Sequence, residues 1–335
     1  MSRLPVPSLR PFPMFADTTD HSLLNFEQRL VFRTVARGEP LMSQGEAADF
    51  FAIVLSGDAT ATRASSDGPV VLANLGAGDI VGELGLLLGR LRAATITAAT
   101  DIEVLLGDET AFSALLDLAG VHEQIGLQVS RRLAEDTKAI PIGRGAKDLV
   151  QLRPLVPGDR EPIYAAANAA SPQTLYRRFF TPGVPDKRVL DHLVDIDFVD
   201  HFAWVCLSED AVGIGVARYI RDRDDPSSAE CAFSVDDNWQ GQGIGTLLLG
   251  SLATAALSAG IETLTGSVLA ENAPMRALFK KAGARSRHSE PGVVEVELSV
   301  DAACELISVN DRLALTATVV DIVHAGGLAL TGQRQ

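Results

Sequence analysis

The sequence predicts two α+β domains in one chain, a small β-roll with helices followed by an α/β domain with a mixed central sheet. The 335 residues exceed the ~100–150 residues of an ordinary single domain. Short β-rich runs separated by glycines fill much of the first part, whereas strands and helices alternate in the second. With 47% hydrophobic and 21% charged residues, the chain can bury enough apolar surface to fold throughout.

The first domain is expected over residues 1–140. Four prolines in residues 1–14 predict an extended arm, and a helix follows near Ser22–Phe32. Strands are expected at FFAIVL, ATATR, VVLANL, ATITAAT and IEVLL, which together suggest a small barrel or sandwich. Apolar residues spaced by three or four then predict one long helix over 109–138, namely Leu118, Val121, Ile125, Val129 and Leu133.

Residues 141–148 are expected to form a linker, with Gly143 and Gly145 as a hinge. The second domain is then predicted over 149–299 and a helical tail over 300–335. Strands are expected at 149–154, 202–207, 211–220, 229–235, 263–269 and 293–299, with helices at 159–169, 243–259 and 273–282.

Composition excludes several classes of function. A net charge of −14 repels phosphate backbones and anionic lipids, so neither nucleic acid nor a membrane is an expected partner. Three widely spaced cysteines and scattered histidines predict neither disulfides nor a metal site. No apolar run approaches the ~18–20 residues that span a bilayer, and no signal peptide begins the chain, so a cytoplasmic location is expected.

Residues 82–95 carry the chemistry of a phosphate site. Small residues let backbone N–H groups approach an anion, Arg92 can form charge-assisted bonds with phosphate oxygens, and Glu83 can accept a bond from a ribose hydroxyl. These are the groups that a cyclic phosphate on a ribose requires. A structural ion pair between Glu83 and Arg92 is the alternative interpretation.

The stretch resembles the phosphate-binding cassette of the cyclic-nucleotide-binding superfamily, over about residues 12–140. The resemblance implies that Glu83 holds the ribose 2′-hydroxyl and Arg92 pairs with the cyclic phosphate. Ala93 directly after the arginine favours cAMP over cGMP, while Gly85 and Leu91 depart from the usual pattern. The implied cAMP site comprises Gly82, Glu83, Leu84, Gly85, Arg92, Ala93, Ala94 and Thr95.

A second glycine-rich stretch, residues 240–245, stands between a predicted strand and an apolar helix. Glycines at such a junction expose N–H groups, and the helix dipole favours a diphosphate. This Q-x-x-G-x-G form and residues 272–284 resemble motifs A and B of the GNAT acetyltransferases, over about 149–299. The implied acetyl-CoA contacts are Phe233, Val235, Gln240, Gly241, Gln242, Gly243, Ile244, Gly245, Asn272 and Arg276.

Catalysis of acyl transfer to an amine requires a base, because an amine with a pKa near 10.4 is protonated at neutral pH. Glu230 is the only carboxylate on the strand before the glycine loop, and we expect it to be the general base. Motif B usually carries a tyrosine that protonates the leaving thiolate, but this sequence has Phe279. A thiol with a pKa near 8.5 leaves readily as the anion. A ping-pong mechanism through Cys206 or Cys231 is disfavoured, since both lie in strand-like runs.

The order of the two motif sets resembles the cAMP-regulated protein lysine acetyltransferases of mycobacteria. The resemblance implies lysine acetylation of other proteins, with acyl-CoA ligases and universal stress proteins as typical targets. Alternatives are a small-molecule amine acetyltransferase under cAMP control and an inactive cAMP-responsive adaptor. Residues 171–201 are expected to form either a lid that depends on cAMP or a helix pair packed on the sheet.

Overall fold

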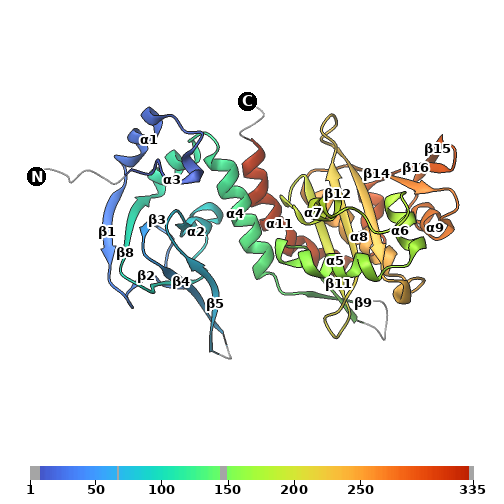
Figure 1. Cartoon of the computed structure of the whole chain (residues 1–335), viewed down its shortest axis with the longest axis horizontal. Helices are drawn as coiled ribbons and strands as arrows, with labels where there is room; N and C mark the ends of the chain where they lie inside the picture. The colour runs from blue at the N-terminus through green and yellow to red at the C-terminus, as the bar shows by residue number, and fades with distance from the viewer. Residues whose placement is uncertain (1–7, 66–67, 144–148, 332–335) are drawn as a thin grey trace, which may run out of the picture. The chain divides into compact units, whose positions relative to one another are not determined.

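The computed structural model describes residues 8–65, 68–143 and 149–331. Within the described chain, contacts group the residues into two compact units, one within Met1–Val129 together with residues from Ala325 onward, and one spanning Ser130–His324. Each unit has its own β-sheets (Figure 1). The two-domain α+β class predicted from the sequence is thereby confirmed. The domain limits remain a prediction.

The N-terminal unit contains two four-stranded sheets, ordered β1-β8-β3-β6 and β2-β7-β4-β5. One buried cluster draws on both sheets, including Val54 and Val104 from the first and Ala61 and Ile96 from the second. The core therefore lies between the sheets. The strands are β1 (Val31–Val35), β2 (Pro40–Met42), β3 (Phe50–Ser56), β4 (Ala59–Ser65), β5 (Gly68–Leu75), β6 (Ile80–Val81), β7 (Thr95–Ala98) and β8 (Ile102–Asp108).

The helices of this part differ from the sequence prediction in two places. The first full helix, α1 (Asp20–Glu27), ends before Phe32, which belongs to β1. The single helix expected over 109–138 is two helices, α3 (Glu109–Leu116) and α4 (Val121–Asp136). Gly120 separates them with a φ of 75°, a left-handed conformation that ends a helix and that glycine adopts without strain. Two short helices complete this part, η1 (Pro13–Phe15) and α2 (Glu83–Leu88).

The C-terminal unit is built on an eight-stranded sheet with the order β15-β16-β14-β13-β12-β11-β10-β9. Among the strands of this sheet that the structure describes, β13 and β14 are the one parallel pair, because helix α8 connects them as a crossover. The strands are β9 (Ile140–Gly143), β10 (Leu149–Pro154), β11 (His201–Leu207), β12 (Gly213–Arg221), β13 (Ser228–Val235), β14 (Thr263–Leu269), β15 (Arg285–Glu290) and β16 (Val293–Ser299).

Helices cover both faces of this sheet. A Cβ on Gly215 of β12 would contact Leu248 and Ile244 of α8, whereas Arg218 of the same strand bonds to Leu193 on the other face. The helices and helical turns are η2 (Pro157–Asp159), α5 (Arg160–Ala169), α6 (Pro172–Phe179), α7 (Lys187–Val194), η3 (Asp237–Trp239), α8 (Ile244–Ser258), α9 (Ala273–Lys281), α10 (Val300–Cys304) and α11 (Val309–Thr331). Most of α8 is buried, as its apolar composition predicts.

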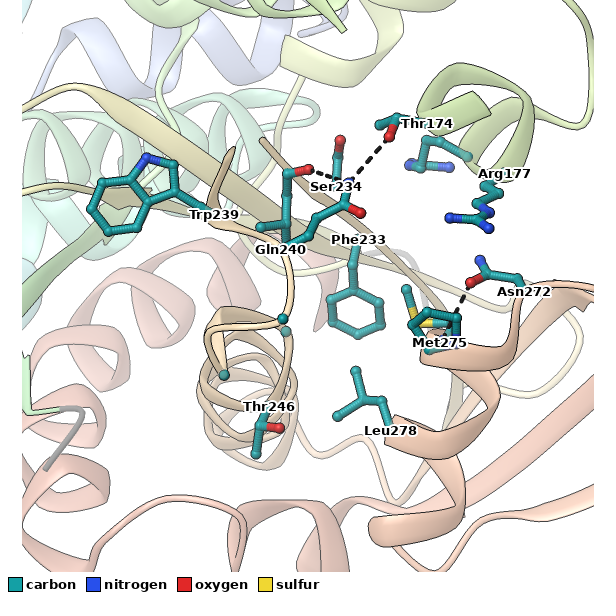
Figure 2. A pocket seen from close by; sticks show the side chains of 16 residues that line it. Thr174, Arg177, Phe233, Ser234, Trp239, Gln240, Thr246, Asn272, Met275 and Leu278 are labelled. Atoms are coloured by element: carbon teal, nitrogen blue, oxygen red, sulfur yellow. Dashed lines mark hydrogen bonds between the residues drawn. The ribbon is translucent and has the colours of Figure 1, made fainter. Parts of the chain in front are cut away.

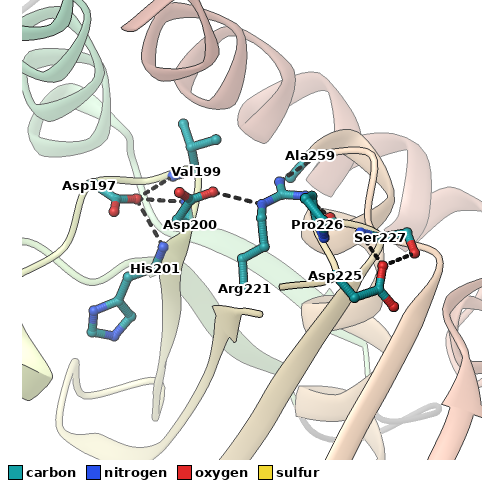
Figure 3. Close-up of polar contacts among 9 residues, drawn as sticks. All are labelled: Asp197, Val199, Asp200, His201, Arg221, Asp225, Pro226, Ser227 and Ala259. Carbon is teal, nitrogen blue, oxygen red and sulfur yellow. Dashed lines mark hydrogen bonds and ion pairs between the residues drawn. The ribbon is translucent and has the colours of Figure 1, made fainter. Parts of the chain in front are cut away.

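Polar contacts fix the ends of the central strands (Figure 3). Asp197 Oδ1 accepts bonds from the backbone N–H groups of Val199, Asp200 and His201 at 2.7 to 2.9 Å. Arg221 pairs with Asp200 at 2.7 Å and donates to the carbonyl of Ala259. These bonds fasten the start of β11 and the end of β12 to the C-terminal end of α8.

Two predicted segments differ from the structure near the middle of the chain. Residues 140–143, part of which was expected in the linker, form the edge strand β9 and pair with β10. The rest of the expected linker, including the hinge glycine Gly145, lies outside the described residues. Residues 171–201 contain the helix pair α6 and α7, and α6 packs on β13.

We predict that Gly107→Ala destabilises the N-terminal unit. The added Cβ would lie 2.3 Å from Phe51 and 2.9 Å from Leu30, and overpacking of this kind costs about 1–3 kcal/mol. Urea unfolding followed by circular dichroism should show an earlier transition. Gly213→Ala is the matched control, because nothing lies within 4 Å of its Cβ position; equal midpoints for the two variants would contradict the packing described.

Candidate functional site: an acyl-carrier cleft and a phosphate cassette

The central sheet opens at β13. This strand pairs with β14 only through Ser228, Ala229 and Glu230, although it continues to pair with β12 as far as Val235. The backbone groups of residues 231–235 that face β14 are therefore free of sheet bonds. An extended ligand can add to such an edge as another strand would.

A cavity of about 370 Å³ lies at this opening, lined in part by Phe233, Ser234 and Val235 of β13 (Figure 2). The glycine loop supplies Gly241, Gly243 and Gly245. Gly241 and Gly243 have φ angles of 74° and 87°, which a residue with a side chain adopts only with strain. The sequence-predicted loop and strand thus line one cavity.

Gly243 also begins α8, and no side chain caps that end of the helix. The N–H groups of the first turn are consequently available, and the helix dipole favours an anion there. Thr246 adds a hydroxyl-bearing side chain to the same wall. Open glycine geometry, an uncapped helix and a cavity fit the diphosphate of an acyl carrier.

Gln240 ties the loop to helix α6. Its side-chain nitrogen lies 2.9 Å from Asp237 Oδ1, 3.1 Å from the Thr174 hydroxyl and 3.2 Å from the carbonyl of Val235. Thr174 in turn donates to Asp237 at 2.6 Å, and the backbone N–H of Ser171 donates to the other carboxylate oxygen. These bonds lower the pKa of Asp237 below its usual range, with the Thr174 bond as the largest cause.

Asn272 begins helix α9 and accepts a bond from the backbone N–H of Met275 at 3.3 Å. It is 7% exposed and lines the cavity together with Met275 and Leu278. The predicted contacts Gln242, Ile244 and Arg276 are not among the residues that line it. Gln242 bonds to Asn238, Ile244 is buried in the core, and Arg276 lines a separate hollow between α9 and the strands β15 and β16.

Glu230 lines a second cavity of about 500 Å³, which continues from the first. The two share Arg177, Arg178, Phe233, Asn272 and Met275. Glu230 is the residue at which β13 and β14 part, and it is exposed to this cavity. The carboxylate therefore stands at one end of the cleft and the glycine loop at the other.

Phe279 and Cys231 also line the second cavity. The ring of Phe279 is buried and packs edge to face on Phe233, with 6.2 Å between ring centres. The pKa of the Cys231 thiol is raised to about 12, and burial is the largest cause of this rise. A thiol with that pKa supplies almost no thiolate at neutral pH, so Cys231 is a poor nucleophile.

Two arginines of α6 line the candidate site, although the motifs did not include them. Arg177 and Arg178 line both cavities. Burial lowers the pKa of Arg178, and the charge of Glu230 opposes that effect. In the sequence, the signal for this wall was the pair of adjacent arginines within residues 171–201, the segment expected to form either a lid or a helix pair.

The second predicted site lies in the N-terminal unit. Arg92 is 4% exposed and donates to the carbonyls of Gly82 at 3.0 Å and Phe50 at 2.6 Å. Its guanidinium stacks on the Phe50 ring at 4.6 Å and lies 3.6 Å from Asp49. Burial lowers the pKa of Arg92, although the nearby charge of Asp49 acts to raise it. Its Nε is buried without a partner, so a further acceptor such as phosphate fits there.

Glu83 begins α2 and is 2% exposed. Gly82 precedes it with a φ of 84°, and a Cβ on Gly82 would lie 2.6 Å from Arg92 Nη1. A Cβ on Gly85 would lie 2.5 Å from that of Ala48. This contact explains why glycine replaces the usual alanine here. Leu84, Ala93 and Ala94 lie in the same stretch, and the Thr95 hydroxyl accepts from the N–H of Gln44.

The two sites define the class of protein. Residues 150–285 match the Acetyltransferase (GNAT) domain, and residues 32–118 match the Cyclic nucleotide-binding domain. The chain is 35% identical over 265 residues to "Acetyltransferase Pat" of Mycolicibacterium smegmatis, a match that covers 78% of this chain and 79% of that protein. The chain therefore belongs to the acetyltransferase family in which a cyclic-nucleotide-binding domain is joined to a GNAT domain.

One further relative matches a single domain, and one solved structure matches most of the chain. The cAMP-dependent protein kinase regulatory subunit of Mycosarcoma maydis is 37% identical over 122 residues, covering 35% of this chain and 23% of that protein. A solved structure of a cAMP-binding acyltransferase from Mycobacterium smegmatis is 27% identical with a TM-score of 0.48, covering 95% of this chain and 96% of that one.

Within the described ranges, no helix is long and apolar enough to cross a membrane. The same residues contain no cluster of three or more histidine, cysteine or acidic side chains suited to hold a metal ion.

We predict that Thr174→Val weakens acetyl-CoA binding. The change removes the hydroxyl through which α6 bonds to both Asp237 and Gln240, and the loss of these two bonds should raise the dissociation constant about threefold to tenfold. Titration calorimetry measures the effect. Thr318→Val is the control, because that hydroxyl bonds to the carbonyl of Ala314 on α11 and does not line the acyl cavity. An unchanged affinity in Thr174→Val would show that the loop needs no such bond to α6.

Proposed function

We propose that the chain transfers the acetyl group of acetyl-CoA to the ε-amino group of lysine in protein substrates, under control by cAMP. The observation that carries this proposal is the position of Glu230, at the parting of β13 and β14 and in the cavity that continues from the glycine loop. Acyl-CoA ligases and universal stress proteins are the proposed targets, because the resemblance to the cAMP-regulated lysine acetyltransferases implies them.

The residues present support acetyl-CoA as the bound substrate. Bound acetyl-CoA would supply the activated acyl group, with its diphosphate at Gly241, Gly243 and Gly245 and its pantetheine arm near Asn272. The free N–H groups of β13 between Phe233 and Val235 would hold the acyl carbonyl oxygen. Preorganised donors of this kind stabilise the charge that develops on that oxygen during transfer.

Glu230 would then act on the incoming lysine. A lysine amine has to lose a proton before it attacks, and the Glu230 carboxylate accepts it directly or through one water. Phe279 offers no proton to the departing thiol, so the thiolate leaves as the anion, which a pKa near 8.5 permits. Three glutamates line the second cavity against two arginines, so its acidic groups outnumber its basic ones, which favours entry of a lysine.

The N-terminal site would bind cAMP as the regulator. Glu83 would accept a bond from the ribose 2′-hydroxyl, and the unpartnered Nε of Arg92 supports a phosphate partner. We expect cAMP to activate the enzyme, because the resemblance to the cAMP-regulated lysine acetyltransferases implies activation. We include in this proposal that α6 and α7 act as a lid whose position depends on cAMP. Helix α6 carries Thr174 and Arg178, which line the acyl cavity, so a shift of α6 would alter that cavity.

We predict that Glu230→Gln lowers turnover about 10²–10⁴-fold while acetyl-CoA binding persists, because the base is lost and the acyl cavity is not. Release of free CoA measures turnover, and calorimetry measures binding. Raising the pH toward the pKa of lysine should recover part of the rate, since the amine then loses its proton unaided. Exposed Glu262 provides the control, Glu262→Gln. Full activity in Glu230→Gln would remove Glu230 from this role.

We predict that Arg92→Ala abolishes cAMP binding. Wild-type protein at about 100 times the dissociation constant should gain about 2.7 kcal/mol of stability, visible as a rise in the melting temperature, and the variant should gain none. Arg33→Ala, an exposed arginine on β1, should respond as wild type does. Equal cAMP-dependent rises in both variants would exclude Arg92 from the site.

Protein and small-molecule substrates can be separated by mass spectrometry. Purified acyl-CoA ligase and universal stress protein substrates are compared with a panel of polyamines and aminoglycosides. Acetylated lysines on the proteins support the proposal, and modification of the small amines alone would replace it.

A further inference from the structure

A small cavity of about 70 Å³ lies between helices α5, α6 and α7 and the sheet. Most of its wall is apolar, and its polar residues are Thr174, Arg178, Arg218 and Ser234. None of the residues that line it is acidic. Two arginine side chains therefore line one small cavity that no carboxylate lines.

Arg218 is the more deeply buried of the two, with 3% exposure. Its Nη1 donates to the carbonyl of Leu193 and to the His201 ring nitrogen Nε2, which lies 3.1 Å away. Both acceptors are neutral. The Leu193 carbonyl carries no charge, and burial is the largest of the effects that lower the pKa of His201 to about 4. His201 Nδ1 lies 2.9 Å from the carbonyl of Asp195, which fixes the tautomer that leaves Nε2 as the acceptor.

The charge of Arg218 is not compensated within the described part of the chain. Burial lowers its pKa to about 9, and the nearby charge of Arg178 lowers it further. Glu230 counteracts the burial of Arg178, but no carboxylate does the same for Arg218. Buried charges in proteins are normally paired, because an isolated one costs several kcal/mol.

The cavity has the donors and the space for a small ion. Arg178 and Arg218 line it, and the half-buried Ser234 adds a hydroxyl. The Thr174 hydroxyl is already engaged with Asp237 and Gln240. A single water needs roughly 10–15 Å³, so this volume accommodates an ion of a few heavy atoms.

We propose that Arg218, Arg178 and Ser234 form a binding site for a small monovalent anion. The anion supplies the charge that the protein itself does not place beside Arg218. Thr174, Arg178 and Ser234 also line the acetyl-CoA cavity. The anion therefore has two possible sources, a free ion such as chloride or the terminal carboxylate of a longer acyl group on CoA.

The free-ion source is tested by thermal unfolding at constant ionic strength, with chloride replacing gluconate, which is too large for the cavity. Wild-type protein should show a saturable rise of about 3 °C at a tenfold excess over the dissociation constant. Arg218→Gln should lose this response. Arg223→Gln removes an equal charge from an exposed loop position and should keep it.

Crystals of the wild-type protein grown in bromide provide a readout that does not depend on the folding of a variant. An anomalous peak within hydrogen-bond distance of the Arg218 guanidinium supports the free ion. For the tethered source, calorimetry compares succinyl-CoA with acetyl-CoA. A preference for succinyl-CoA in wild type that Arg218→Gln abolishes supports an acyl carboxylate.

The proposal is overturned if wild-type protein shows no bromide peak, no chloride-specific stabilisation and no preference for succinyl-CoA. A chloride response that is equal in wild type and Arg218→Gln likewise places the ion elsewhere. These outcomes are separate from the proposed acetyl transfer, because acetyl-CoA turnover enters none of these readouts.

Discussion

The acyl site depends on one limit in the hydrogen bonding of the sheet. Strands β13 and β14 pair over only three residues, and the bonds that the rest of β13 would make to β14 are left for a ligand. A polar backbone group without a partner is costly when buried, so it is tolerated only beside a space that water or a ligand fills. The cavities at this opening supply that space. The parting of two strands thus determines where the acyl carrier and Glu230 can meet.

Local sequence rules were sufficient for most of the elements. The predicted strand at 263–269 and helix at 273–282 match β14 and α9 within a residue, because apolar periodicity and glycine or proline boundaries coincide there. Strand β15 was missed, since Arg285–Glu290 is a polar segment at the sheet edge and its pairing comes from β16. The α3–α4 break was also missed, because apolar spacing continues across it and only Gly120 marks the turn.

The motifs located the two sites but not all of their walls. Residues adjacent in a motif, such as Gly241 to Gly245, share a function through the local backbone, so a linear pattern detects them. Arg177 and Arg178 reach the same cavity from a helix about sixty residues earlier, and tertiary packing alone brings them there. Arg276 shows the opposite case, because its position within a motif does not determine which side of α9 its side chain takes.

Hydrogen–deuterium exchange with residue resolution, on the full chain with and without acetyl-CoA, tests the account most directly. Ligand that adds to the free edge of β13 should slow exchange at residues 233–235 and in the first turn of α8, residues 244–246. Within β13, the amides that bond to β12 should change little, and the slowing should fall on amides that face the opening toward β14. Slower exchange elsewhere in the C-terminal unit, with no change at residues 233–235, would show that acetyl-CoA does not occupy the opening between β13 and β14.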